Sequence, residues 1–169
     1  PSDKSRKLSF EERVKSWKER GYIIHFMTGI AWGEYQDYFT GQWDGKWHLD
    51  EGQVTQTGDT IWHGHMVPYI VPSENFLSYL KERHVKRVID AGVDAIWVGD
   101  DFGSQTSTLF APEMFRKLLL PYYKKMIDTL KAKKPDLVMI LHSDGAVGTL
   151  MPMIKECGFD VFNPVQPGV

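Results

Sequence analysis

Cysteine is nearly absent from this chain of 169 residues, in which Cys157 stands alone. A single cysteine forms no internal disulfide, so a disulfide-stapled scaffold is excluded and we expect a reducing, cytoplasmic setting. An excess of charge of one sign is lacking too: 20 Lys and Arg face 22 Asp and Glu, a formal net charge of −2. Nucleic-acid and anionic-membrane binding need clustered Lys and Arg, so neither partner is expected.

Long hydrophobic runs and the common cofactor motifs are missing as well. No stretch approaches the roughly 18 consecutive apolar residues of a membrane-spanning helix. The chain has no Gly-x-Gly-x-x-Gly, no P-loop, no Cys-x-x-Cys and no nucleophile elbow. It does have 42% apolar and 13% aromatic residues, which predict one globular domain with a sizeable core.

Residues 1–65 are expected to form an N-terminal part with one helix, one strand and an irregular excursion rich in Trp and Gly. Ser9 and Glu12 have the spacing of a capping box, and Gly21 is a suitable residue to end the helix that follows. The apolar run over residues 22–27 is typical of a strand buried on both faces.

Residues 66–169 are expected to carry a regular alternation of helices and strands. The apolar spacing predicts helices over residues 74–91, 112–133 and 147–157, and strands over residues 95–98, 137–141 and 160–163. Such alternation indicates an α/β fold with a parallel sheet, either a (β/α) barrel or an open doubly wound sheet.

Polar side chains follow three consecutive strands of this predicted sheet. In both architectures the active site lies at the carboxyl ends of the strands. Burying such polar groups in a hydrophobic core costs free energy unless they are paired. We therefore expect a site at this edge, built from the residues that follow each strand: Asp100 and Asp101, then His142 and Asp144, then Asn163 and Gln166.

The residue types suggest acid–base chemistry or a metal. Asp100 and Asp101 are adjacent, so their side chains diverge and one is expected to face the pocket, where it accepts a proton or binds a ligand. His142 and Asp144 are two residues apart and can point the same way, as metal ligands or as an acid–base pair. The alternative is structural: a cap or brace at Asp100–Asp101, and a hydrogen-bonded pair that stabilises the turn after Asp144.

Five runs of this sequence, taken in order and spacing, resemble the uroporphyrinogen decarboxylase superfamily, which also holds corrinoid-dependent methyltransferases. They are residues 91–96, 100–105 with 111–116, 142–145, and 158–166. The resemblance covers roughly residues 76–168 and implies a (β/α)₈ TIM barrel with its site in the barrel mouth. Such a barrel takes about 250 residues, so we expect a partial barrel of about four to five strands. It is either a fragment of a longer protein or a half that pairs with a second copy.

The resemblance implies metal-assisted methyl transfer from a small methyl donor to a corrinoid or thiol acceptor as the leading function. His142 and Asp144 would then bind zinc, Asp100 and Asp101 would join them as catalytic residues, and a corrinoid protein would be a partner. Asp144 stands where the methyltransferase branch has cysteine, and a carboxylate is a harder ligand. Substrate binding is assigned to four polar residues: Gln105, Asn163, Gln166 and Glu34.

Three alternatives remain open. The first is metal-free decarboxylation of a porphyrinogen or another carboxylate, although residues 22–38 contain none of the arginines that hold the porphyrin's carboxylates in the family. The second is a barrel glycosidase with Asp101 and Glu34 as its carboxylate pair. The third is an inactive barrel fragment that keeps site residues without a complete site.

Overall fold

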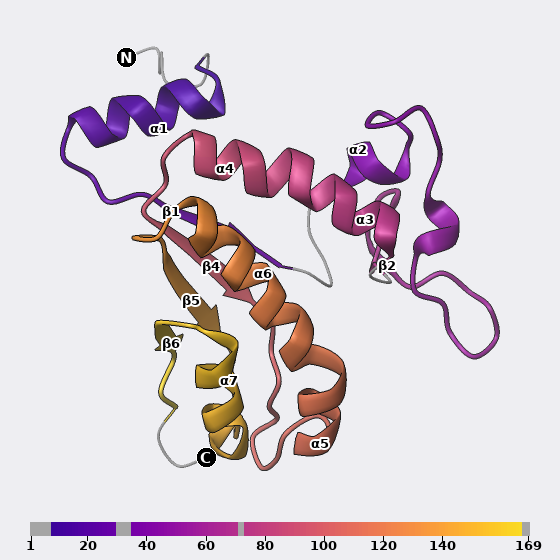
Figure 1. Ribbon diagram of the computed structural model, residues 1–169. Helices are drawn as coiled ribbons and strands as arrows, with labels where there is room; N and C mark the ends of the chain where they lie inside the picture. The colour runs from indigo at the N-terminus through magenta and orange to yellow at the C-terminus, as the bar shows by residue number, and fades with distance from the viewer. Residues whose placement is uncertain (1–7, 30–34, 71–72, 167–169) are drawn as a thin grey trace, which may run out of the picture. The chain divides into compact units, whose positions relative to one another are not determined.

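The computed structural model describes residues 8–29, 35–70 and 73–166, and the chain divides into two compact units (Figure 1). Unit 1 comprises Pro1–Met27 and Arg87–Val169, and unit 2 comprises Thr28–Lys86. Unit 1 thus groups the first helix and most of the first strand with the later α/β segment. In the described ranges, no helix combines the length and the apolar character needed to cross a membrane.

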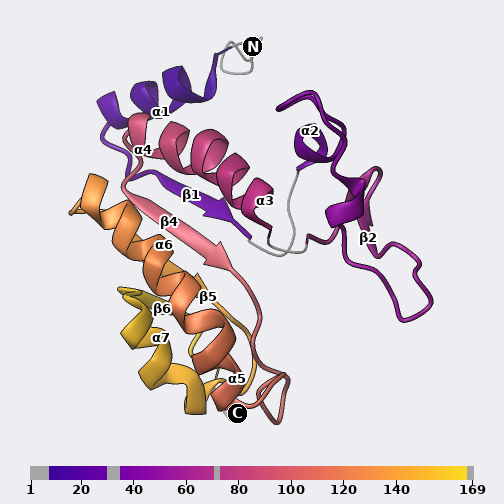
Figure 2. The same cartoon turned by 45° about the vertical axis from the view of Figure 1, so that its right-hand side comes forward.

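Unit 1 is an α/β layer built on a four-stranded sheet. Its elements are α1 (Phe10–Glu19), β1 (His25–Thr28), α4 (Arg87–Asp90), β4 (Ala95–Gly99), α5 (Pro112–Met114), the π-helical η4 (Phe115–Leu119), α6 (Leu120–Lys133), β5 (Val138–His142), the 3₁₀ turn η5 (Gly148–Leu150), α7 (Met151–Cys157) and β6 (Val161–Asn163). The strand order is β1-β4-β5-β6. β4 runs parallel to β5 and β5 to β6, and Figure 2 shows β1 and β4 pointing the same way. The expected α/β class and parallel sheet are confirmed.

The two faces of this sheet differ. Figures 1 and 2 show α6 and α7 over one side of the sheet. One set of alternate strand residues, Val98, Met139 and Leu141, is buried and points to one face. The other face carries Trp97, whose ring lies 6.1 Å from the ring of His142. This face is partly open, since Val138 is 37% exposed.

Capping signals in the sequence place the helix ends correctly. Ser9 accepts from the backbone N–H of Glu12, whose carboxylate accepts from the N–H of Ser9, a complete capping box. Gly158 ends α7 in the left-handed region, with φ 98°. The predicted helix over residues 112–133 contains a π-helical segment just before Pro121, which fits the first turn of α6 because its missing N–H is not needed there.

Unit 2 is small and held by aromatic packing. It contains α2 (Gln36–Phe39), the 3₁₀ turn η2 (Leu49–Glu51), an antiparallel pair of β2 (Trp62–Gly64) and β3 (Val67–Pro68), α3 (Glu74–Tyr79) and the π-helical η3 (Leu80–Lys86). Its core comprises Tyr35, Tyr38, Phe39, Val67, Ile70, Phe76 and Tyr79. Residues 46–49 form no regular strand: Trp47 makes one isolated bridge to Thr40, and the chain then turns into η2.

A buried polar cluster accompanies this aromatic core. His48 is 5% exposed, and its ring nitrogens lie 3.1 Å from Asp44 and 3.3 Å from Glu51. The ring stacks on Tyr38 with centroids 4.4 Å apart. Glu51 also accepts from the amide of Asn75 at 2.8 Å. Buried polar groups need such partners, so the cluster joins η2 to the core.

Candidate functional site

Three strands end side by side at one edge of the sheet in unit 1. The last residue of β4, Gly99, is in register with His142 at the end of β5, and His142 is in register with Asn163 at the end of β6. The segments that follow these strands therefore leave the sheet together. This is the edge at which ligands bind in parallel α/β folds.

The loops after β4 and β5 cross with their backbones in contact. Ala146 N donates to Ser104 O at 2.7 Å, and Phe102 N donates to the buried hydroxyl of Ser143 at 2.8 Å. A Cβ on Gly103 would lie 2.8 Å from Asp144 O. Only a residue without a side chain permits this approach, so Gly103 sets the distance between the two loops.

Asp101, His142 and Asp144 converge at this crossing. One ligand-type atom from each lies within 4.8 Å of the other two. His142 Nε2 is 3.9 Å from Asp144 Oδ2, and the backbone N–H of Asp144 donates to Asp101 Oδ1 at 3.0 Å. The cluster is therefore a shared feature of the two loops, with His142 half-buried and both carboxylates facing solvent.

Asn163 orients the imidazole of His142. Its Oδ1 lies 2.9 Å from His142 Nδ1, and a carbonyl oxygen only accepts, so Nδ1 carries the proton. In the neutral ring this leaves the lone pair on Nε2, the nitrogen that faces Asp144. Asn163, which was assigned to substrate binding, thus orients the ring of His142.

Asp100 lies apart from this cluster, on the side of α6. The hydroxyl of Tyr123 donates to Asp100 Oδ2 at 2.7 Å. Burial, followed by the charge of Asp100, raises the pKa of Tyr123 well above its ordinary value. The side chains of the two adjacent aspartates therefore diverge. Asp101 belongs to the cluster, whereas Asp100 links the end of β4 to Tyr123 on α6.

Two glutamines brace the loops around the cluster. Gly145 N donates to Gln166 Oε1 at 3.0 Å, and Gln166 Nε2 donates to Gln105 Oε1 at 2.9 Å. Both side chains therefore link the segments after β4, β5 and β6, next to the cluster. Glu34, the fourth residue assigned to substrate binding, lies outside the described residues.

Sequence reasoning overlooked Trp97. Its indole Nε1 is buried and has no hydrogen-bond partner among the described residues, and the ring lies between those of His25 and His142, with centroids 6.5 Å and 6.1 Å away. A buried donor without a partner is costly. Its position in β4, two residues before the strand end, was the available signal, since residues two apart share a face.

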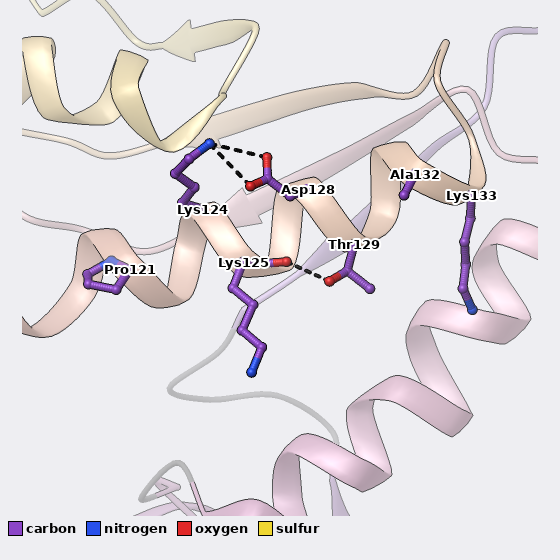
Figure 3. A pocket seen from close by; sticks show the side chains of 7 residues that line it. All are labelled: Pro121, Lys124, Lys125, Asp128, Thr129, Ala132 and Lys133. Carbon is purple, nitrogen blue, oxygen red and sulfur yellow. Dashed lines mark hydrogen bonds and ion pairs between the residues drawn. The ribbon is translucent and has the colours of Figure 1, made fainter.

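A shallow hollow on the exposed side of α6 has no comparable chemistry. All of its lining residues come from that one helix: Pro121, Lys124, Lys125, Asp128, Thr129, Ala132 and Lys133 (Figure 3). Lys124 pairs with Asp128 at 3.2 Å, and the Thr129 hydroxyl donates to the carbonyl of Lys125 at 2.6 Å. Groups paired within one helix do not converge on a ligand, so we assign this surface no role.

Comparison with known proteins identifies a family over the part of the chain that carries the cluster. The model of the family "Uroporphyrinogen decarboxylase (URO-D)" matches residues 75–164, which is more than half of the chain. The chain belongs to the uroporphyrinogen decarboxylase family. This confirms the resemblance, and the family implies a TIM barrel, of which the sheet β1-β4-β5-β6 is a part. In such a barrel, the face that carries Trp97 and His142 would be the side toward the interior.

Individual relatives agree over the same region. Uroporphyrinogen decarboxylase of Hordeum vulgare is 32% identical over 78 residues, 46% of this chain and 22% of the relative. The protein of the same name from Picosynechococcus is 36% identical over 73 residues, 43% of this chain and 19% of the relative. That from Chlorobium limicola is 32% identical over 88 residues, 52% of this chain and 22% of the relative. The matched part thus spans about a fifth of the length of these relatives.

Proposed function

We propose that this chain supplies part of an active site that removes a carboxyl group, as CO₂, from a carboxylate substrate, with a porphyrinogen as the first candidate. The observation that carries the proposal is the convergence of Asp101, His142 and Asp144 where β4 and β5 end. The names of the relatives support a decarboxylase over the methyltransferase that the sequence first suggested.

The chemistry of decarboxylation defines what such a site must provide. When CO₂ leaves, the electron pair of the broken C–C bond stays on the substrate, where it must be delocalised until a proton replaces the lost group. The cluster is suited to bind and polarise such a substrate, because it offers hydrogen-bonding groups from two loops held rigidly by Gly103 and Gly145. Positioning of this kind lowers the barrier only if the groups are fixed beforehand.

The porphyrinogen is tested directly by incubating the protein anaerobically with uroporphyrinogen and counting the carboxyl groups of the product by chromatography. We expect progressive loss of carboxyl groups, and a rate at least 100-fold lower in His142→Ala. The matched control is Asp136→Asn, which lies shortly before the first residue of β5, at the other end of the strand from His142. This variant should have the same rate as the wild type. Absence of CO₂ release from porphyrinogens and from smaller carboxylates alike would contradict the proposal.

Metal-assisted methyl transfer to a corrinoid or thiol acceptor is the second candidate, with a corrinoid protein as the partner. The observation that favours it is that the cluster offers one imidazole and two carboxylates, all metal-ligand types. Incubation with a methyl-corrinoid and a thiol tests it: the corrinoid absorption spectrum changes if the methyl group is transferred. An unchanged spectrum with active decarboxylation would reject this candidate.

A further inference from the structure

We propose that Trp97, His25 and Gly99 form a substrate subsite for an acid whose carboxylate is carried by a flat ring. The subsite lies on the same face of the sheet as His142. The inference rests on the proposed function and deepens it, because it names the class of carboxylate that the site would take. The ring is either that of a free single-ring acid or one pyrrole of a porphyrinogen.

These residues share one face of the sheet in unit 1. Trp97 and Gly99 are two positions apart in β4, so they face the same side. Gly99 is in register with His142 on β5. The centroid of the Trp97 ring lies 6.5 Å from that of His25 on β1 and 6.1 Å from that of His142. The subsite therefore adjoins the cluster through His142 and lies one layer of side chains further from the strand ends.

The indole of Trp97 supplies a hydrogen-bond donor for the acid. Its Nε1 is buried and has no partner within the described part of the chain. An unpaired buried donor is costly, and a ligand that brings an acceptor removes this cost. An ionised carboxylate oxygen only accepts, and a hydrogen bond to it is roughly twice as strong as one to a neutral acceptor. The N–H of Trp97 therefore favours an anionic oxygen as its partner.

His25 can supply the positive charge that a carboxylate needs when it leaves water. It is exposed and lies on β1, the strand next to β4. Residues 22–38 contain no Lys or Arg, so His25 is the one side chain of this segment that can become a cation. A protonated imidazole donates from both ring nitrogens. Trp97 and His25 thus offer one neutral and one chargeable donor to the same carboxylate.

Gly99 leaves room for the ring of the acid. A Cβ added there would meet one group of the described residues within 4 Å, the methyl end of Met27 at 3.3 Å. Met27 is 62% exposed, and an unbranched methionine side chain adapts easily, so this end can move aside. An acid that enters past Met27 places its ring beside Gly99 and its carboxylate at Trp97. The space corresponds to one missing side chain, which suits one ring and not a whole macrocycle.

The indole N–H signals of the six tryptophans in a nuclear magnetic resonance spectrum test the inference. A hydrogen bond to a carboxylate moves the proton signal downfield, and the signal of Trp97 is the one that Trp97→Phe removes. We expect pyrrole-2-carboxylate to shift this signal and not that of Trp47, which is 61% exposed in unit 2. An unshifted Trp97 signal at saturating acid would overturn the subsite.

Titration calorimetry with the same acid measures what each donor contributes. We expect at least about tenfold weaker binding in Trp97→Phe and in His25→Phe, as for the loss of a hydrogen bond to a charged group. Trp47→Phe is the matched control, since it removes an indole from an exposed position, and should bind like the wild type. Equal affinity in Trp97→Phe and the wild type, or an equal loss in the control, would contradict the proposal.

Gly99→Ala tests the space for the ring with little risk to the fold, because the added Cβ meets only the flexible end of Met27. We expect weaker binding of pyrrole-2-carboxylate and unchanged binding of acetate, which has no ring. An equal loss for both acids would overturn the assignment of the ring to this space.

Uroporphyrinogen, added with air excluded, separates the two sources of the ring. A shift of the Trp97 signal by uroporphyrinogen alone identifies a pyrrole of the macrocycle, and a shift by pyrrole-2-carboxylate alone identifies a free acid. Either result upholds the subsite, and a shift by neither overturns it. A shifted Trp97 signal without CO₂ release upholds the subsite and contradicts only the proposed reaction. CO₂ release with an unshifted signal does the reverse.

Discussion

Gly103 and Gly145 lie backbone against backbone where the loops after β4 and β5 cross. A Cβ added to Gly145 would come within 2.5 Å of Ser104 O and 2.6 Å of the carbonyl carbon of Gly103. Gly145 also has φ 86°. The side chains that make up the cluster flank these two glycines in sequence, so the crossing determines the shape of the site.

Gly145→Ala is therefore expected to destabilise unit 1 and disturb the cluster. The left-handed conformation alone costs a residue with a side chain about 1–3 kcal/mol, and the close contact with Gly103 adds to this. Gly148→Ala is the control, because a Cβ there meets nothing within 4 Å and no positive φ is required. Urea unfolding measures the stability of both variants. Equal midpoints would show that the loops tolerate a side chain at their crossing.

Tyr123→Phe is expected to destabilise unit 1 by about 1.5–3 kcal/mol, the usual contribution of a hydrogen bond to a charged group. The lost bond is the 2.7 Å contact from the Tyr123 hydroxyl to Asp100. Tyr122→Phe on the same helix removes a hydroxyl from a side chain that is 65% exposed, and should change stability by less than about 0.5 kcal/mol.

The same pair of variants separates the two roles considered for Asp100. If Asp100 serves to hold the strand end against α6, Tyr123→Phe lowers the thermal midpoint while the rate of CO₂ release stays within twofold of the wild type. A large loss of this rate with unchanged stability would instead place Asp100 among the catalytic residues.

Asp160 is expected to contribute stability at neutral pH that is lost in acid. Burial raises its pKa, but hydrogen bonds from Lys131 and from the backbone N–H of Met139 outweigh burial and leave the pKa below its ordinary value of 3.8. A lowered folded-state pKa means that the contribution is fully present above about pH 4 and disappears as the pH falls through the folded-state value.

Urea midpoints at pH 7 and pH 3 measure this. Asp160→Asn should lower the midpoint at pH 7 and make a smaller difference at pH 3. Asp128→Asn, which breaks an exposed pair with Lys124 on α6, should change little at either pH, because such pairs contribute about 0–1 kcal/mol. A difference for Asp160→Asn that grows in acid would reverse the sign assigned here.

The sequence was sufficient for those parts of the fold that local patterns determine. The capping box at Ser9, the glycine that ends α7 and the apolar runs of β4, β5 and β6 are short-range signals, and each lies where it was expected. The rule that ligands bind at the carboxyl ends of parallel strands then predicted that one of Asp100 and Asp101 would lie at the same edge as His142 and Asp144.

What the sequence did not reveal depends on contacts between distant segments. The partner of Asp100 is Tyr123, which lies on α6 with its ring among Phe102 and Phe115, and no local pattern pairs an aspartate with a tyrosine 23 positions later. Unit 2 was the least predictable part. Its aromatic core is surrounded by segments that form isolated bridges and short turns. Periodicity carries no information about such segments.

Glu51→Gln is expected to loosen unit 2. The Glu51 carboxylate lies between His48, Asn75 and the hydroxyls of Tyr38 and Ser73. Burial raises its pKa, but the hydrogen bonds from Asn75, Ser73, Tyr38 and His48 leave it below the ordinary value, so the charged form is the one that the cluster holds. A glutamine amide presents one acceptor in place of two, and its NH₂ group must face a donor.

Because buried networks fail as a unit, the loss should reach the whole of unit 2. We expect about 1–3 kcal/mol of destabilisation, seen as faster hydrogen exchange across α2 and α3, with unit 1 unchanged. Asp50→Asn is the matched control, since it removes the same charge from the neighbouring position, where the side chain is exposed. Equal rates of hydrogen exchange in both variants would mean that only the charge matters at η2. Faster exchange in Glu51→Gln alone would show that the buried hydrogen bonds of the Glu51 carboxylate hold this unit together.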